Sequence, residues 1–234
     1  MSNQYFDFKH FRVEQDRCSM KVGTDGVLLG AWFPLQPGMS VLDIGTGTGL
    51  VALMAAQRGA GNVTAVEIDP DAAEQASENA VNSPWKDRIF VRCTDISDFT
   101  ADSGFDRIVC NPPFFRDSLR CPDAGRNTAR HNDSLSFETL AGVSSDMLSD
   151  DGLLCVVLPY DVVDAFVKCA LNEGLNLCRK TDVVTAPGKT PKRSLLAFGK
   201  HFVELKTDVI AMYDSKGKES LEYINLVRDF YFKF

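Results

Sequence analysis

Short apolar runs rich in branched residues alternate with longer stretches of helical spacing from Ser40 onward. Runs that are apolar almost throughout are typical of strands buried on both faces, and such strands in alternation with helices indicate a parallel sheet. The pattern therefore predicts an α/β fold with helices on both faces of a mostly parallel sheet. The predicted strands are residues 41–44, 63–67, 89–92, 105–110 and 153–158, and the predicted helices are residues 49–58, 69–82, 135–148 and 161–171.

Two further runs, residues 177–185 and 194–199, flank a turn-rich stretch with Pro187, Gly188 and Pro191. Such an arrangement predicts an antiparallel pair at the sheet edge, which residues 203–212 extend or follow. Both ends of the chain lack clear periodicity and are expected to be irregular. We interpret the chain as one domain, with an N-terminal extension (1–39), a core (40–200) and a C-terminal edge addition (201–234).

The composition fits a single folded domain without metal or disulfides. The chain has 234 residues, of which 44% are hydrophobic, and its seven cysteines are scattered without a Cys-x-x-Cys pair. No apolar run is long enough for a membrane span, and the first residues are too polar for a signal peptide, so a cytoplasmic location is expected. The net charge of −7 argues against generic nucleic-acid binding, so a nucleic-acid partner requires a local basic patch.

A glycine loop, Gly45-Thr46-Gly47-Thr48-Gly49, connects the first predicted strand of the core to a helix. Glycine at this point lets the backbone approach a ligand closely. Dinucleotide-binding loops usually have Gly-x-Gly-x-x-Gly, whereas here the third glycine comes one residue early. Asp43 at the end of the strand would repel a pyrophosphate but would attract an ammonium group. The loop therefore favours a zwitterionic ligand.

Two further carboxylates follow the next predicted strands. Glu67 comes about twenty residues after the loop, where a carboxylate accepts hydrogen bonds from both ribose hydroxyls. Asp95 follows the third strand and could accept a hydrogen bond from an adenine amino group, with Ile68 and Ile96 on the two faces of the ring. Any one of these acids alone would be an ordinary solvated strand end, but three in this order indicate a nucleoside ligand.

The tetrapeptide Asn111-Pro112-Pro113-Phe114 directly follows the strand predicted at 105–110. Both prolines fix φ and lack a backbone donor, so the segment is predicted to be a stiff, exposed loop. A side-chain amide, a proline carbonyl and an aromatic face would be held in fixed positions there. This combination suits a planar group with an exocyclic amine. Taken alone, however, the tetrapeptide is more typical of a proline-rich turn with a buried Phe114, and only the residues upstream favour the amine site.

The glycine loop, the three carboxylates and the tetrapeptide together resemble the class I S-adenosylmethionine-dependent methyltransferases over residues 41–158. The resemblance implies a seven-stranded sheet whose last strand is antiparallel, and a cofactor bound across the carboxyl ends of the first four strands. It assigns Asp43, Gly45, Thr46, Gly47, Glu67, Ile68, Asp95, Ile96 and Asn111 to the binding of S-adenosylmethionine, with S-adenosylhomocysteine as product. It also implies that Asn111 and Pro112 accept the hydrogens of a planar amine, that Pro113 stiffens the loop and that Phe114 stacks on the substrate.

The tetrapeptide occurs in enzymes that methylate adenine N6 in DNA or RNA, guanine N2 in RNA, or glutamine N5 in proteins. The chain has no room for a target-recognition domain of about 100 residues, which argues against DNA. Residues 20–32 and 226–231, together with the tetrapeptide, resemble bacterial valine-tRNA adenine-N6 methyltransferases. This resemblance implies methylation of the adenine 3′ of the anticodon, and places Lys21 and Thr24 over the methionine end of the cofactor. Methylation of glutamine in a protein or of rRNA remains an alternative, and a non-catalytic RNA-binding scaffold is least favoured.

A tRNA substrate requires basic contacts, and two stretches near the predicted site supply them. Cationic loops of this kind are expected to hold an anticodon stem-loop by its phosphates. We expect a monomer that binds no metal. The candidate RNA-binding residues are Arg116, Arg120, Arg126, Arg130 and His131 in the first stretch and Lys189, Lys192 and Arg193 in the second.

Overall fold

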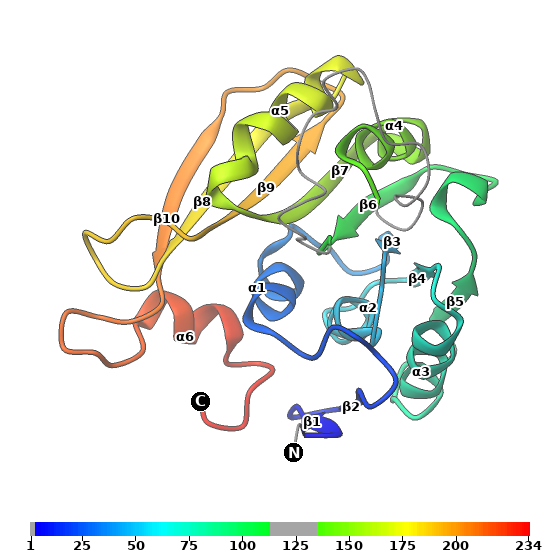
Figure 1. The fold of residues 1–234 in the computed structure, drawn as a ribbon, viewed down its shortest axis with the longest axis horizontal. Coiled ribbons are helices and arrows are strands. Elements are labelled where there is room, and N and C mark those ends of the chain that lie inside the picture. Colours follow the sequence, from blue (N-terminus) through cyan, green and yellow to red (C-terminus); the bar gives the residue numbers. More distant parts are fainter. Residues whose placement is uncertain (1–2, 113–134) are drawn as a thin grey trace, which may run out of the picture.

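A computed structural model describes residues 3–112 and 135–234, and a large sheet forms its centre (Figure 1). The strands are β3 (Ser40–Ile44), β4 (Asn62–Glu67), β5 (Ile89–Cys93), β6 (Phe105–Cys110), β7 (Leu148–Pro159), β8 (Asn176–Val184), β9 (Arg193–Gly199) and β10 (Lys206–Ala211). They lie in the order β10-β8-β9-β7-β6-β3-β4-β5. Neighbouring strands are parallel except at β9, which is antiparallel to both β7 and β8. The predicted mostly parallel α/β fold is confirmed.

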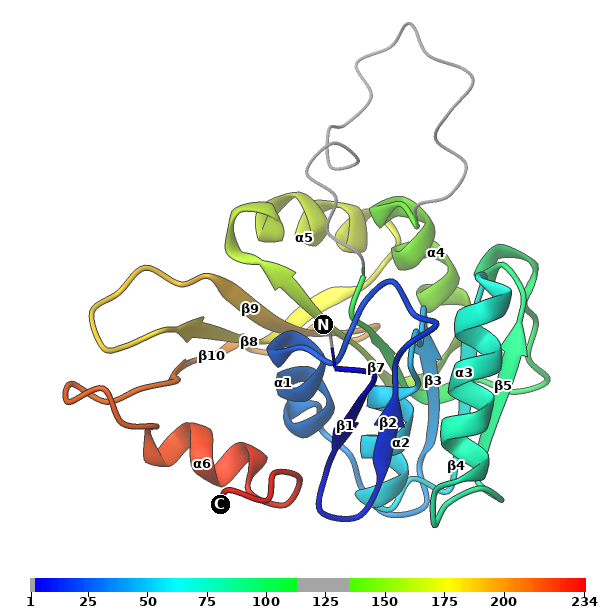
Figure 2. The ribbon, with the colours of Figure 1, turned by 60° about the horizontal axis from the view of Figure 1, so that its bottom comes forward.

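Helices cover both faces of this sheet, as Figure 2 shows. Alternation along a strand sends successive side chains to opposite faces, so Val41 joins one hydrophobic core and Leu42 joins the other. The first core includes side chains of α1 (Thr24–Trp32), α2 (Leu50–Gln57), α3 (Pro70–Val81) and α6 (Leu221–Val227). The second core includes side chains of α4 (Phe137–Met147) and α5 (Val163–Asn172).

Local sequence signals set the starts of two helices. The Asp69 side chain accepts hydrogen bonds from the backbone N–H groups of Asp71 and Ala72, and Pro70 occupies the first turn of α3. The Ser136 hydroxyl accepts a hydrogen bond from the Thr139 N–H at the start of α4. The sequence predicts a cap at Asp69, which is confirmed, and a cap at either Ser134 or Ser136, of which the structure shows Ser136.

In the described part of the chain the sheet has eight strands rather than the predicted seven, because β10 pairs in parallel with β8. The predicted antiparallel pair therefore does not lie at the edge: β9 is in the interior between β7 and β8, and β10 is the edge strand. The side chains of β10 are mostly exposed and half of its residues are polar, which suits an edge position. Strand β7 also begins earlier than predicted, at Leu148, with an irregular register beside β6.

We expected the N-terminal segment to be irregular because it lacks periodicity, but the structure shows that it contains regular strands. Strands β1 (Tyr5–Asp7) and β2 (Arg12–Glu14) form an antiparallel hairpin. The rings of Phe8 and Tyr231 stack with centroids 5.7 Å apart, and the Lys9 ammonium donates hydrogen bonds to the carbonyls of Arg228 and Phe234. The N-terminal and C-terminal segments therefore pack against each other. None of the helices in the described part of the chain is long and apolar enough to cross a membrane.

Candidate active site

A cleft lies over the carboxyl ends of β3, β4 and β6, where parallel α/β sheets bind their ligands. It consists of a cavity of about 480 Å³ and a smaller one of about 190 Å³. Ile44, Gly45, Glu67, Ile68 and Leu135 line both, so the two cavities adjoin. Each of the predicted cofactor-binding residues that we describe below lines one or both of them.

The glycine loop forms one wall of the larger cavity. Gly45, Gly47 and Gly49 have φ angles of 66°, 55° and 81°, in the left-handed region that favours glycine. A Cβ atom built at Gly45 or Gly47 would meet no atom within 4 Å, so the space beside the backbone is open. The loop therefore presents bare backbone to a ligand.

Asp43 is buried beneath this loop, with only 2% of its surface exposed. Its Oδ2 accepts hydrogen bonds from the Thr46 hydroxyl at 2.6 Å and from the Ala52 N–H at 3.1 Å. Burial raises the pKa of Asp43 to about 7, although both hydrogen bonds favour the charged form. Asp43 thus fixes the shape of the loop, and its contact with an ammonium group stays a prediction.

The Glu67 carboxylate joins the end of β4 to the glycine loop. Its Oε2 accepts a hydrogen bond from the Gly47 N–H at 2.8 Å, and its Oε1 accepts from the N–H groups of Ile68 and Asp69 at 2.9 and 3.1 Å. Oε2 therefore keeps a lone pair for a further donor, whereas Oε1 already accepts from two. The predicted contact with ribose hydroxyls is compatible with this arrangement, and remains a prediction.

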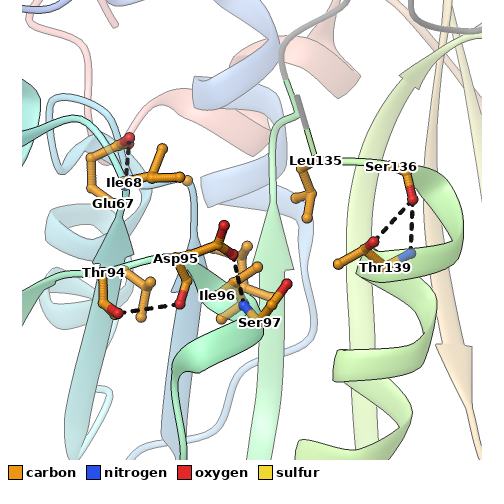
Figure 3. A pocket seen from close by; sticks show the side chains of 12 residues that line it. Glu67, Ile68, Thr94, Asp95, Ile96, Ser97, Leu135, Ser136 and Thr139 are labelled. Atoms are coloured by element: carbon orange, nitrogen blue, oxygen red, sulfur yellow. Dashed lines mark hydrogen bonds between the residues drawn. The ribbon is translucent and has the colours of Figure 1, made fainter. Parts of the chain in front are cut away.

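The smaller cavity is a slot between β5 and α4 (Figure 3). Ile68, which is 53% exposed, and Ile96, which is buried, contribute its apolar surface. The Asp95 carboxylate accepts a hydrogen bond from the Ser97 N–H at 2.8 Å and so caps the short helix η1 (Ile96–Asp98). Figure 3 shows Leu135, Ser136 and Thr139 on the opposite side of the slot. Apolar walls with a carboxylate at one edge suit a planar ring that carries an amino group.

Asn111 lies directly after β6, in the larger cavity. Its Oδ1 atom is buried and has no hydrogen-bond partner among the described residues, whereas its Nδ2 lies 3.7 Å from the Met20 sulfur. A buried acceptor without a partner costs about 1–3 kcal/mol. The carbonyl oxygen of this amide is therefore ready to accept a hydrogen bond from a ligand.

Residues 15–23, which we call the strap, connect β2 to α1 and cover another side of the larger cavity. Lys21 and Thr24 both line this cavity, and the Lys21 ammonium also donates a hydrogen bond to the Gln15 carbonyl. Their contact with the cofactor stays a prediction. Helix α1 begins at Thr24 with Gly23 as its N-cap, so no side chain caps its first N–H groups. Free N–H groups at the positive end of a helix dipole favour an anionic group.

The predicted basic residues do not all lie at the cleft. Arg193 lines it and forms an ion pair with Asp25 of α1, with 2.6 Å between Nε and Oδ2. Lys192 precedes it without lining the cleft, and Lys189 lines a separate cavity of about 820 Å³ between the β8–β9 loop and residues 209–222. The remaining predicted site residues lie outside the described part of the chain: Pro113, Phe114, Arg116, Arg120, Arg126, Arg130 and His131.

The structure adds residues that we did not predict for the cleft. Met20 touches Asn111, and Asp25 holds Arg193. A Cβ atom at Gly26 would lie 3.0 Å from a Leu50 side-chain carbon, so glycine allows α1 to approach closely. The only available signal for these residues was the Gly-Thr-Asp-Gly stretch ahead of an apolar helix. Within residues 3–112 and 135–234 no group of three or more histidine, cysteine or acidic side chains is placed to hold a metal ion.

Comparisons with known proteins identify the class. Residues 20–159 match the family described as methyltransferase small domain. A predicted O-methyltransferase from Agrobacterium tumefaciens has the same fold, with a TM-score of 0.69 and 19% identity over 88% of this chain and 96% of that one. A glycopeptide N-methyltransferase in complex with S-adenosylmethionine is similar over 77% of this chain and 100% of that one, with a TM-score of 0.56 and 14% identity. The fold is that of the class I S-adenosylmethionine-dependent methyltransferases.

Relatives with higher identity define the family. A Bacteroides fragilis protein named tRNA1(Val) (adenine(37)-N6)-methyltransferase is 50% identical, with 100% of both chains covered. A Yersinia enterocolitica protein of the same name is 40% identical over 98% of this chain and 93% of that one. The chain belongs to the tRNA1(Val) (adenine(37)-N6)-methyltransferase family.

Proposed function

We propose that this chain transfers a methyl group from S-adenosylmethionine to the exocyclic N6 of an adenine in tRNA, namely the adenine 3′ of the anticodon of valine tRNA. The observation that carries this proposal is the buried Oδ1 of Asn111, which has no partner among residues 3–112 and 135–234 and lies in the cavity beside the glycine loop. The names of the full-length relatives support the choice of substrate. Action on tRNA supports a cytoplasmic location.

The residues of the cleft fit S-adenosylmethionine. The open backbone of Gly45 and Gly47 leaves room for the ligand, and the uncapped start of α1 beside Lys21 suits its carboxylate. Glu67 would accept the ribose hydroxyls. The slot with Ile68, Asp95 and Ile96 would take the adenine ring, with the carboxylate near its amino group. Asp43, beneath the loop, would face the ammonium group.

The acceptor nitrogen requires alignment more than a base. The lone pair of an adenine amino group is delocalised into the ring, so the nitrogen is a poor nucleophile. Hydrogen bonds to the Asn111 Oδ1 and the Pro112 carbonyl would hold both amino hydrogens and turn the lone pair out of conjugation. The nitrogen becomes cationic as its bond to carbon forms, and its proton then leaves without a strong base.

When bound, S-adenosylmethionine supplies a methyl group on a positively charged sulfur. Asn111 and Pro112 would aim the amine at that methyl, and positioning of two reactants is worth about 7–11 kcal/mol of the barrier. Phe114, by our prediction, stacks on the flipped adenine, a contact worth about 1–3 kcal/mol. The chain would thus catalyse the reaction mainly by orientation.

Basic side chains at the same edge of the sheet would hold the tRNA. Arg193 is already oriented by Asp25 at the mouth of the cleft, and Lys192 and Lys189 continue along the β8–β9 loop. The predicted arginines that follow the tetrapeptide would add to this surface. Phosphate contacts of this kind position a nucleic acid without reading its sequence, so they would set the register of the anticodon loop.

A methylation assay with purified protein tests this proposal. Labelled S-adenosylmethionine is supplied with an unmodified valine tRNA transcript, and the nucleosides are analysed by mass spectrometry. We expect N6-methyladenosine with this transcript and none when adenine 37 is replaced by guanine. Methylation of the substituted transcript to the same extent would rule out the proposed target.

A further inference from the structure

The strap supplies five residues to the lining of the larger cavity but has no regular secondary structure of its own. These residues are Cys18, Ser19, Met20, Lys21 and Gly23. A segment without backbone pairing needs other contacts to keep one conformation, because ordering each residue costs about 1–2 kcal/mol. Two buried amides on α3 hold the strap in place.

Asn79 is 2% exposed and forms hydrogen bonds with three backbone groups. Its Oδ1 accepts from the Glu14 N–H at 2.9 Å, and its Nδ2 donates to the Glu14 carbonyl at 2.8 Å. Nδ2 also donates to the Thr48 carbonyl at 2.9 Å. One side chain thus connects the end of β2, from which the strap starts, with the glycine loop. The strap and the glycine loop are two walls of the same cavity.

Gln75, one helical turn earlier on α3, holds the middle of this region. It is 1% exposed, and its Oε1 accepts a hydrogen bond from the Arg17 N–H at 2.8 Å. Its Nε2 donates to the Asp16 carboxylate, also at 2.8 Å, and this hydrogen bond lowers the pKa of Asp16. Residues four apart lie on the same face of a helix, so both amides face the strap.

Within the strap a third amide completes the arrangement. The Gln15 Oε1 accepts a hydrogen bond from the Val22 N–H at 2.7 Å, and so joins its two ends. Arg17 adds ion pairs with Glu74 and Glu78 on the exposed side of α3, where such pairs contribute little. The buried amides are therefore the principal attachment of the strap to α3.

We propose that Asn79, supported by Gln75, is a positioning residue for cofactor binding. Neither residue lines the cavity, so neither touches the cofactor. Asn79 acts through the strap and the Thr48 carbonyl, and fixes the separation between Lys21 on one wall and the glycine loop on the other. This inference rests on the proposed function, because it assumes that the cofactor occupies this cavity.

The test uses the full chain with Asn79→Leu, which keeps the volume but removes the three hydrogen bonds. We expect the dissociation constant for S-adenosylhomocysteine, measured by calorimetry, to rise by about tenfold, which corresponds to the loss of one or two net hydrogen bonds. With tRNA, the KM for S-adenosylmethionine should rise similarly, and kcat at saturating cofactor should change by less than about threefold. Gln75→Met, a substitution of similar volume, should also raise the dissociation constant for S-adenosylhomocysteine. It replaces Asn79→Leu as the test variant if that variant does not fold.

Asp106→Ala is the matched control for a general loss of stability. The Asp106 Oδ2 accepts hydrogen bonds from the Ser40 N–H and hydroxyl at 2.8 and 3.0 Å, at the amino ends of β3 and β6, away from the cleft. We expect a lower Tm for this variant and an unchanged dissociation constant. The inference would be overturned if folded Asn79→Leu and Gln75→Met bound S-adenosylhomocysteine with wild-type affinity. It would also be overturned if Asp106→Ala lost as much affinity as they do. A wild-type chain that does not bind S-adenosylhomocysteine would instead overturn the proposed function.

Discussion

The buried Asp43 carboxylate makes the stability of this protein depend on pH in a way that one substitution should remove. Burial raises the pKa of Asp43 from its ordinary 3.8 to about 7 in the folded state. Between these values the folded protein holds a proton that the unfolded chain releases. The free energy of unfolding therefore decreases as the pH rises from about 4 to about 7, and the decrease is complete above pH 7.

The size of this effect follows from the shift in pKa. Each pKa unit corresponds to about 1.36 kcal/mol, so ionised Asp43 costs about 4 kcal/mol of stability near pH 8. Asp43→Asn keeps the shape and can still accept from the Ala52 N–H and bond to the Thr46 hydroxyl. The variant should be more stable than wild type near pH 8, by up to about 4 kcal/mol, and the difference should shrink toward pH 4.

Urea unfolding of both proteins, in steps from about pH 5 to about pH 8, measures this difference directly. Thr46→Val, which removes one hydrogen bond but keeps the carboxylate, should keep the pH dependence and serves as control. A difference between Asp43→Asn and wild type that does not change with pH would refute the reasoning. Asp43→Asn should also bind S-adenosylhomocysteine more weakly, because it lacks the carboxylate charge that we propose faces the ammonium group of the ligand.

Three further substitutions address the site and the fold. Asn111→Ala should lower kcat for tRNA methylation by about 100-fold, because the amine loses its hydrogen-bond acceptor, and should change the KM for the cofactor less. Steady-state kinetics would measure both constants, and an unchanged kcat would exclude the proposed role of Asn111. Glu67→Gln keeps an acceptor for the Gly47 N–H but loses the charge, so calorimetry should show about tenfold weaker binding of adenosine and S-adenosylhomocysteine. Gly61→Ala would place a Cβ atom against the Gly38 carbonyl, so thermal unfolding should show that the free energy of unfolding falls by about 1–3 kcal/mol. Cofactor affinity should stay the same, and an unchanged Tm would argue against this packing.

The sequence predicted the parts of this protein that depend on local signals. The apolar runs of the core became strands, and the caps at Asp69 and Ser136 begin helices as expected. Asp43, Glu67 and Asp95 were recognisable because each ends or follows a strand, and the carboxyl ends of parallel strands meet at one edge. The structure accordingly brings all three to the cleft.

Other features depend on contacts that the local sequence does not indicate. Strands β1 and β2 are only three residues long, too short for a recognisable period, and their pairing depends on packing of the two chain ends. Residues 203–212 were expected to extend or follow the antiparallel pair, but the mostly exposed side chains of β10 do not indicate that it pairs in parallel with β8. Gln75 and Asn79 have the composition of an ordinary polar helix face, and only the folded strap explains why they are buried.

Mass spectrometry of valine tRNA from a strain in which this gene is deleted tests the methylation of adenine 37 most directly. Digestion into oligonucleotides locates any methyl group to the anticodon loop. We predict that N6-methyladenosine at position 37 disappears on deletion, returns with the wild-type gene and does not return with Asn111→Ala. Unchanged N6-methyladenosine at that position in the deletion strain would contradict this prediction.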